Sequence, residues 1–328
     1  MNEIISRMLD IPYVKLHFKL IFEEEVFLPT NKVPGLRGGM GQMLLNSNCV
    51  ENPDVSFEER KCETCRFQSE CIVQRIMYSP FVYKPPFVTQ GESIGFVLDC
   101  QDFNRDYNAG DSLCFDMTLF GQTIVYFNQI LQAYHMLGMT GLGTQRGRFH
   151  IDRITSTDGQ TLVENQMVDM SRYVIRTLSE YVTYRLRNGM KEKRMKFHTP
   201  VAITYKGSQI NEFSPDAVIS SVCRRIYMLD CFAGIEVSQY DPGDCMPVMK
   251  AQEARPIFTA RYSERQRAKI SISGIKGYMD LEHISDDLYA LLLAGEITHI
   301  GKNTKQGLGR YTLTDPESKF QKERRRQN

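Results

Sequence analysis

The sequence predicts an α+β protein made of two related halves, because one pattern occurs twice along the chain. Residues 285–313 have the pattern of a capped helix, a glycine-rich basic loop and a strand, and residues 123–151 repeat it. Upstream of each copy, the hydrophobic periodicity indicates a strand, a helix and further strands. A βαββαβ order that occurs twice predicts two tandem ferredoxin-like (RRM-like) domains.

The first half begins with alternating residues that are typical of a strand. A short helix follows, in which Leu36, Met40 and Leu44 recur at helical spacing despite three glycines. We place strands at residues 13–27, 81–87, 93–100, 112–120 and from 149 onward, and helices at residues 36–45 and 124–134.

The second half has the same order of elements. Ser214 is a predicted N-cap, and the helix that follows it ends near Gly234. The last helix is predicted to begin after Ser285 and to end near Gly295. We place strands at residues 197–205, 256–262, 268–279 and 311–313.

Composition describes a globular chain long enough for two domains, with 328 residues, 42% of them hydrophobic and 24% charged. No apolar run reaches the length of a membrane span and the N-terminus lacks the plan of a signal peptide, so we expect a cytoplasmic protein without a membrane partner.

Charge is distributed unevenly along the chain. Residues 1–184 hold 16 Lys and Arg against 22 Asp and Glu, a balance of −6, whereas residues 185–328 hold 24 against 17, a balance of +7. The sign changes at a basic stretch, where we place the boundary between domains at residues 1–190 and 191–315. Residues 316–328 form a basic tail that we expect to be mobile.

The two glycine-rich loops suggest binding of a phosphate backbone, since glycine lets a backbone approach a ligand and cations supply the charge. Lys32 and Arg37 flank the glycine-rich first helix. The alternative for the two loops is that they are tight turns whose cations are solvated. The alternative for the glycine-rich first helix is that its glycines allow close packing against a sheet. The loop cations are Arg146, Arg148, Lys302, Lys305 and Arg310.

Four of the nine cysteines cluster with the spacing C-x12-C-x2-C-x5-C, at Cys49, Cys62, Cys65 and Cys71. Four soft ligands without histidine favour a structural Zn²⁺ site over an iron–sulfur cluster. The site would fold an insertion at about residues 47–75 that otherwise lacks a core. The alternative is four reduced surface thiols.

Residues 261–313, which begin RYSERQRAKISISG and end GKNTKQGLGRYTL, resemble the C-terminal signature of the CRISPR precursor-RNA-processing endoribonucleases of the RAMP superfamily. The segments LPTNKVPGLRGGMGQML and LGMTGLGTQRGRF resemble the matching elements of its larger branch, which carries the four-cysteine insertion. The resemblance implies two tandem ferredoxin-like domains that bind CRISPR repeat RNA, as precursor and as mature guide. It also implies one cut per repeat without a catalytic metal.

Metal-free RNA cleavage proceeds by in-line attack of the neighbouring 2′-hydroxyl, which leaves a 2′,3′-cyclic phosphate and a 5′-hydroxyl. The protein must align the backbone, neutralise the phosphorane and move protons. Cations suited to the first two tasks are Lys32, Arg37, Arg146, Arg148, Lys302, Lys305 and Arg310. Arg261, Arg265, Arg267 and Lys269 would extend the track along the RNA, unless they are simply solvated.

The resemblance does not supply a proton-transfer residue, because Gln42 stands where related sequences often carry histidine. Lys32, His198 and His299 are the candidates for catalysis, and Tyr78 or Tyr83 beside Lys32 is another arrangement. The catalytic residues are therefore left unassigned.

Two other functions fit the sequence. One is a non-catalytic RNA-binding subunit that holds the repeat-derived end of a guide within a CRISPR effector complex, with other effector subunits as partners; Gln42 favours it. The other is a zinc-stabilised interaction module that binds no nucleic acid and whose glycine loops serve folding alone.

Overall fold

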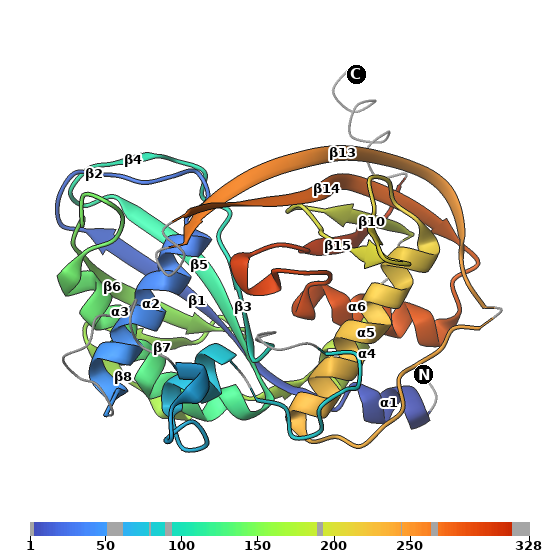
Figure 1. Ribbon diagram of the computed structural model, residues 1–328, viewed down its shortest axis with the longest axis horizontal. Helices are drawn as coiled ribbons and strands as arrows, with labels where there is room; N and C mark the ends of the chain where they lie inside the picture. Colours follow the sequence, from blue (N-terminus) through green and yellow to red (C-terminus); the bar gives the residue numbers. More distant parts are fainter. Residues whose placement is uncertain are drawn as a thin grey trace.

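The computed structural model describes residues 3–50, 62–78, 80–88, 94–188, 193–243, 245–263 and 268–316. It consists of two sheet-and-helix halves that lie side by side (Figure 1). No helix within these ranges is both long and apolar enough to cross a membrane.

The first half is built on a seven-stranded sheet in which every pair of strands is antiparallel. Its order is β3-β5-β1-β6-β7-β8, and β9 pairs with β1. The bounds of these strands are β1 Pro12–Phe22, β3 Phe96–Asp99, β5 Ser112–Phe120, β6 Phe149–Ser156, β7 Thr161–Glu164, β8 Met167–Val168 and β9 Arg176–Thr177.

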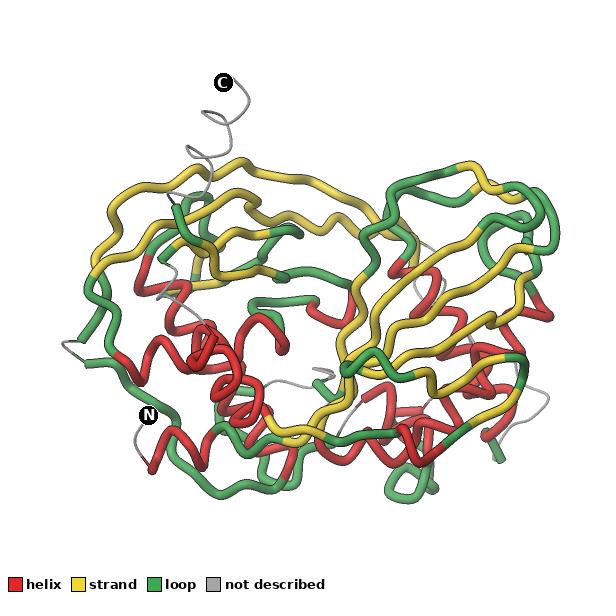
Figure 2. The backbone as a smooth tube through the Cα atoms, turned by 180° about the vertical axis from the view of Figure 1, so that it is seen from behind, coloured by secondary structure: helices red, strands yellow, loops and turns green. Residues whose placement is uncertain are grey.

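Two helices, α2 (Val33–Asn48) and α3 (Phe127–Thr140), cover one face of this sheet (Figure 1). Strand β1 shows how alternation creates the two faces: Val14, Leu16 and Phe18 are buried beneath the helices, whereas Lys15 and His17 point the other way. Seen from behind, the strands of this half lie in front of its helices (Figure 2).

The second half repeats the arrangement with β10 (Arg194–Phe197), β13 (Val248–Ser263), β14 (Ala268–Glu282) and β15 (Tyr311–Thr314) in the order β13-β14-β10-β15. Helices α5 (Pro215–Ala233) and α6 (Asp286–Thr298) cover one face. In both halves the second and third strands of the βαββαβ unit pair, the third pairs with the first, and the first pairs with the fourth. The tandem ferredoxin-like fold is thereby confirmed.

The predicted boundary at residue 190 does not divide the cores. Helices α1 (Glu3–Met8) and α4 (Leu178–Asn188) precede it in sequence, yet both pack against the helices of the second half. The hydroxyl of Tyr181 in α4 donates to Glu296 in α6 at 2.7 Å, and Arg185 forms an ion pair with the same carboxylate. The second core is therefore completed by first-half residues.

Three sequence assignments were wrong. Residues 81–87 form a loop instead of a strand: Phe81 and Phe87 pack against the second core, and the Tyr83 N–H donates to the Cys231 carbonyl. Strand β10 ends at Phe197, and α6 continues beyond Gly295 to Thr298. The apolar residues of the two misassigned strand segments, among them Phe81, Phe87 and Ile203, pack in or against the second core without forming strands.

Short elements complete the chain. The hairpin strands are β2 (Val26–Phe27) with β4 (Asp106–Tyr107), and β11 (Thr204–Tyr205) with β12 (Ser208–Gln209). Single helical turns are η1 Cys62–Thr64, η2 Gln74–Tyr78, η3 Gly121–Tyr126, η4 Met170–Arg172 and η5 Thr304–Gln306.

Gly295 lies inside α6 because Tyr311 occupies the space that a side chain would need. A Cβ at Gly295 would collide with the Tyr311 hydroxyl, which is buried and donates to the Leu292 carbonyl at 2.6 Å. We expect Gly295→Ala to lower the free energy of unfolding by roughly 2–3 kcal/mol, since overpacking and loss of a buried hydrogen bond outweigh the gain in helix propensity.

Gly38→Ala is the matched control, since Gly38 also lies in a helix but a Cβ there meets nothing within 4 Å. It should raise the free energy of unfolding by about 1 kcal/mol. Denaturant titration measures both variants, and a Gly295→Ala protein as stable as the wild type would contradict the packing argument.

Candidate nucleic-acid interface

The open face of the second sheet carries a cleft of about 670 Å³, called here the cationic cleft. Alternation along β10 buries Met195 and Phe197 and turns Arg194 and Lys196 outward. Neighbouring strands add Arg255, Lys276 and Tyr278. Four cations thus line the cleft, against the two carboxylates of Glu253 and Asp315.

Two of these cations are already compensated. Arg194 makes a bidentate pair with Asp280 at 2.6 and 2.7 Å and lies over the Tyr278 ring at 3.9 Å from its centroid. Arg255 pairs with Glu253 at 2.6 Å. Lys196 and Lys276 make no ion pair with any residue that the structure describes, so they leave uncompensated charge for an anionic ligand.

His198 continues the outward row just after β10. Its Nε2 lies 2.8 Å from Thr312 Oγ1. Burial, together with the positive charges of Arg310, Lys196 and Lys276, lowers the pKa of His198 to about 4. The imidazole is therefore neutral at physiological pH and acts here as a hydrogen-bonding group among cations.

The glycine-rich loop between α6 and β15 packs against the first half. Gly307 has a φ of +81°, and a Cβ there would lie 3.1 Å from Val33 and 3.2 Å from the Leu98 carbonyl. Gln306 and Leu308 are buried, whereas Lys302 is exposed and Lys305 is half-buried. The middle of the loop therefore serves contact between the halves, and its exposed part is the corner at Lys302.

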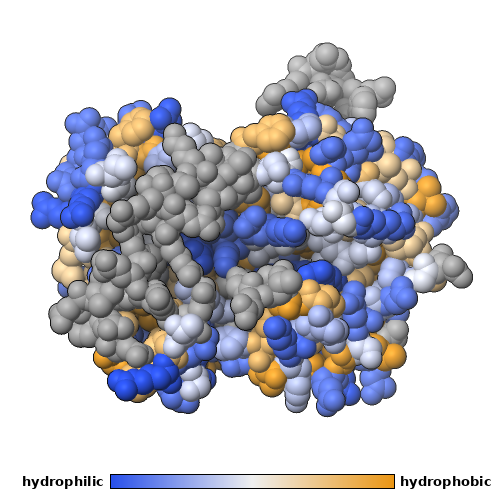
Figure 3. Space-filling view, in the orientation of Figure 1, coloured by the Kyte–Doolittle hydropathy of each residue, from blue (hydrophilic) through white to orange (hydrophobic). Residues whose placement is uncertain are grey.

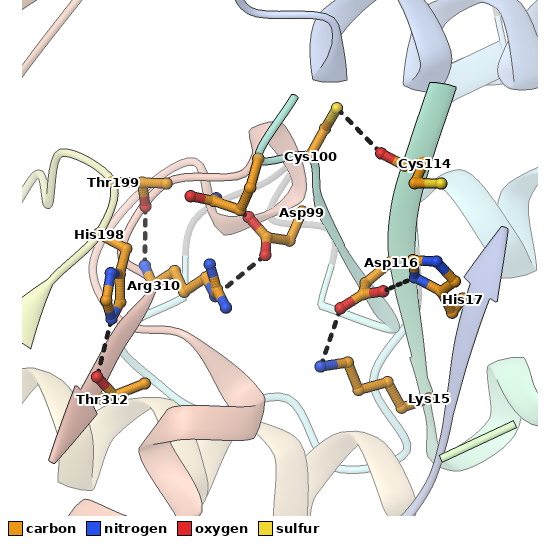
Figure 4. Close-up of polar contacts among 11 residues, drawn as sticks. Lys15, His17, Asp99, Cys100, Cys114, Asp116, His198, Thr199, Arg310 and Thr312 are labelled. Atoms are coloured by element: carbon orange, nitrogen blue, oxygen red, sulfur yellow. Dashed lines mark hydrogen bonds and ion pairs between the residues drawn. The ribbon is translucent and has the colours of Figure 1, made fainter. Parts of the chain in front are cut away.

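Arg310 joins the two halves across an interdomain crevice. Its Nε lies 3.0 Å from Asp99 Oδ2, and its backbone N–H donates to Thr199 Oγ1 (Figure 4). Burial raises the pKa of Asp99, and the Arg310 charge opposes that rise. The Arg310 guanidinium, which the sequence analysis assigned to RNA binding, therefore pairs with a buried carboxylate of the first sheet.

The opposite wall of the crevice carries a cluster that sequence reasoning missed. Asp116 of β5 lies between Lys15, 3.0 Å from its Nζ, and His17, 2.7 Å from its Nδ1 (Figure 4). The alternation of β1 predicts that Lys15 and His17 share a face. Their pairing with Asp116 depends on strand register between segments about 100 residues apart, which the sequence does not reveal. Hydrophilic residues also gather in the hollow between the halves (Figure 3).

Two catalytic candidates from the sequence lie inside the protein. Lys32 is 2% exposed, and its ammonium donates to the carbonyls of Asp102 and Asn104 while lying over the Tyr107 ring. Burial lowers its pKa. His299 is also buried, which lowers its pKa to about 3. Lys32 is enclosed by the first half, and His299 meets only the interdomain crevice.

The remaining RNA-binding candidates do not line the cationic cleft or the crevice. Arg37 is half-buried on α2, and Arg146 is exposed in the loop after α3. Arg148 contacts Glu24 through its backbone N–H at 2.9 Å and its guanidinium at 3.4 Å. The backbone of Arg261 pairs with Ile270 in the β13–β14 hairpin. Arg265 lies outside the described residues.

The four clustered cysteines are free thiols, and each is partly buried. Cys49, Cys62 and Cys71 pack against the first core. Across the described ranges, which leave out residues 51–61, no three His, Cys, Asp or Glu side chains converge as metal ligands. The zinc site therefore stays a prediction from spacing.

Gln42 lies on α2, on the helical side of the first sheet, and donates to Asn46 at 2.9 Å. It is thus separated by the sheet from the outward-facing Lys15, His17 and Asp116.

Solved structures share this fold. The product complex of a Thermus thermophilus Cas6 aligns with a TM-score of 0.51 and 14% identity, over 93% of this chain and 99% of that one. A second Cas6 product complex gives a TM-score of 0.50 and 16% identity over 93% and 100%. A partial Cas6-RT-Cas1–Cas2 complex gives 0.52 and 13% over 93% of this chain and 46% of that one. Comparison with curated proteins finds no match.

Family models cover most of the chain. A model described as an N-terminal domain matches residues 11–179, which is more than half of the sequence. The model of the CRISPR-associated endoribonuclease Cas6 matches residues 195–311. Together with the tandem ferredoxin-like fold, these matches confirm the resemblance seen in the sequence: the chain belongs to the Cas6-type RAMP family.

Proposed function

We propose that this protein binds CRISPR repeat RNA in the cytoplasm and cuts it once per repeat by metal-independent attack of the 2′-hydroxyl. The observation that carries the proposal is the cationic cleft, where Lys196 and Lys276 are uncompensated on the open face of an RRM-like sheet. Such a face combines charge for phosphates with the planar Arg194–Tyr278 stack, against which a base can lie.

The cleft and the crevice suit different tasks in this reaction. The cationic cleft holds the sugar–phosphate backbone and neutralises charge. The crevice brings polar groups of both halves together, and Arg310, which lines it, accepts a hydrogen bond from the His198 N–H through its carbonyl. Positioning and proton transfer without a metal require such convergent groups.

The second candidate function is a non-catalytic RNA-binding subunit of a CRISPR effector complex. Gln42 favours it, because the resemblance leads us to expect histidine there and the amide engages only Asn46 among the described residues. We also propose CRISPR proteins as partners, as in the Cas6-RT-Cas1–Cas2 complex that contains a chain of similar fold.

Cleavage in EDTA separates the two functions. We expect an end-labelled RNA with two repeats of the array encoded beside the gene to be cut once per repeat, because the chemistry needs no dissociable metal. The products should carry 2′,3′-cyclic phosphate and 5′-hydroxyl ends. A 2′-deoxy substitution at the cut site is the control and should abolish cleavage. Tight binding with no product would support the non-catalytic subunit instead.

Lys196→Ala with Lys276→Ala tests the cationic cleft. Loss of two phosphate contacts should weaken repeat-RNA binding about tenfold and reduce the slope of log affinity against log salt by about 1.5. Arg7→Ala with Arg187→Ala removes the same charge from exposed positions on α1 and α4 and serves as the matched control. Equal affinities and slopes for the two double variants would refute the cleft as the RNA site.

We further propose a structural Zn²⁺ held by Cys49, Cys62, Cys65 and Cys71, supported by their spacing and by the contact of three of them with one core. Elemental analysis of the purified protein should find about one zinc per chain, and Cys62→Ser with Cys65→Ser should remove it. Cys245→Ser, at an exposed cysteine outside the cluster, should retain it. Equal metal contents in the two variants would contradict the site.

A further inference from the structure

We propose that His17, oriented by Asp116, accepts the proton of the attacking 2′-hydroxyl, and that Lys15 donates a proton to the leaving 5′-oxygen. This inference rests on the proposed function and supplies the proton-transfer residues that the sequence leaves unassigned. All three side chains come from adjacent strands of the first sheet, on the face that no helix of the first half covers.

Strand register brings the three groups together. His17 of β1 is directly opposite Asp116 of β5, and Lys15 is two residues away on the same face. One carboxylate oxygen lies 2.7 Å from His17 Nδ1, and the other lies 3.0 Å from Lys15 Nζ. Asp116 therefore bridges a base and an acid, each through its own oxygen (Figure 4).

The ionisation of Asp116 fixes the tautomer of His17. Burial raises the pKa of Asp116, but the charge of Lys15 and the hydrogen bond from His17 outweigh that effect, so the net pKa lies below its ordinary value. An ionised carboxylate only accepts hydrogen bonds, so Nδ1 of His17 must donate. Nε2 then carries the lone pair, and the side chain is half exposed to solvent.

Charged groups of both halves meet beside the cluster. Lys15 and Asp116 line the crevice together with Asp99 of β3, Glu296 of α6, and His299 and Arg310 of the second half. On the sheet itself, Cys114 lies on β5, while Lys19 pairs with Asp152 of β6 at 2.9 Å. His17 itself does not line the crevice, and half of its side chain is open to solvent on the face that the helices leave uncovered.

The other histidines fit the role less well. Burial holds the pKa of His198 to about 4 and that of His299 to about 3, so neither takes a proton readily at neutral pH. His150 has a carboxylate partner, Glu23, at the longer distance of 3.5 Å, and that carboxylate makes no ion pair with a lysine among the described residues. His17 combines an orienting carboxylate, an available nitrogen and a neighbouring ammonium.

The step balances within the site. The 2′-oxygen loses its proton to His17 Nε2 and forms a bond to phosphorus, while the bond from phosphorus to the 5′-oxygen breaks. The 5′-oxygen takes its proton from the Lys15 ammonium. One proton has entered the site and one has left it, and exchange with water restores both residues.

Single-turnover cleavage of the two-repeat RNA in EDTA, at saturating protein, tests the assignment. His17→Ala should slow cleavage about 100-fold or more while the Kd for RNA changes less than about twofold. Asp116→Asn should slow it at least about tenfold, because the amide no longer enforces the tautomer. His150→Ala is the matched control, an exposed histidine beside a carboxylate, and should cleave at the wild-type rate.

Added imidazole distinguishes proton transfer from a structural role, since it should restore part of the rate to His17→Ala and none to Lys15→Ala. The assignment to His17 is wrong if His17→Ala cuts as fast as the wild-type protein, or if its rate falls only in parallel with its affinity for RNA. In that case the proposed nuclease function is unaffected. If wild-type protein binds repeat RNA and never cuts it, the proposed nuclease itself fails, and this role fails with it.

Discussion

Each half of this protein depends on one constraint: a pair of helices buries one face of its sheet. Helices α2 and α3 cover the first sheet and α5 and α6 cover the second, so alternation sends every other side chain away from the core. The outward-facing positions are occupied by Lys196 and Lys276 in one half and by Lys15 and His17 in the other. The candidate chemistry of the protein is therefore distributed over two open sheet faces.

Contact between the halves uses charge as well as apolar packing. The glycine-rich loop inserts beside Val33 and Leu98, and Arg310 compensates the buried Asp99. A buried carboxylate is costly unless it is paired, so this contact constrains where the second sheet can sit relative to the first. The same contact fixes His198 and Asp116 on facing walls (Figure 4).

Periodicity was sufficient to predict the order of elements, because hydrophobic spacing of two and of 3.6 residues is a local property. It wrongly predicted a strand at residues 81–87, which form a loop whose Phe81 and Phe87 pack against the second core. Local patterns also could not tell that Lys32 is enclosed or that Arg310 is already paired. The His17–Asp116 contact depends on register between distant strands, which the sequence does not contain in readable form.

Helices α1 and α4 have a consequence for how the protein can move. They belong to the first half by sequence, yet their apolar residues fill the second core, with Tyr181 and Arg185 tied to Glu296. Tyr13, Val97 and Phe120 of the first sheet also pack in the second core, so an opening of the two halves would expose these buried side chains to water. The second core therefore belongs to both halves, and separating them would cost the free energy gained by burying it.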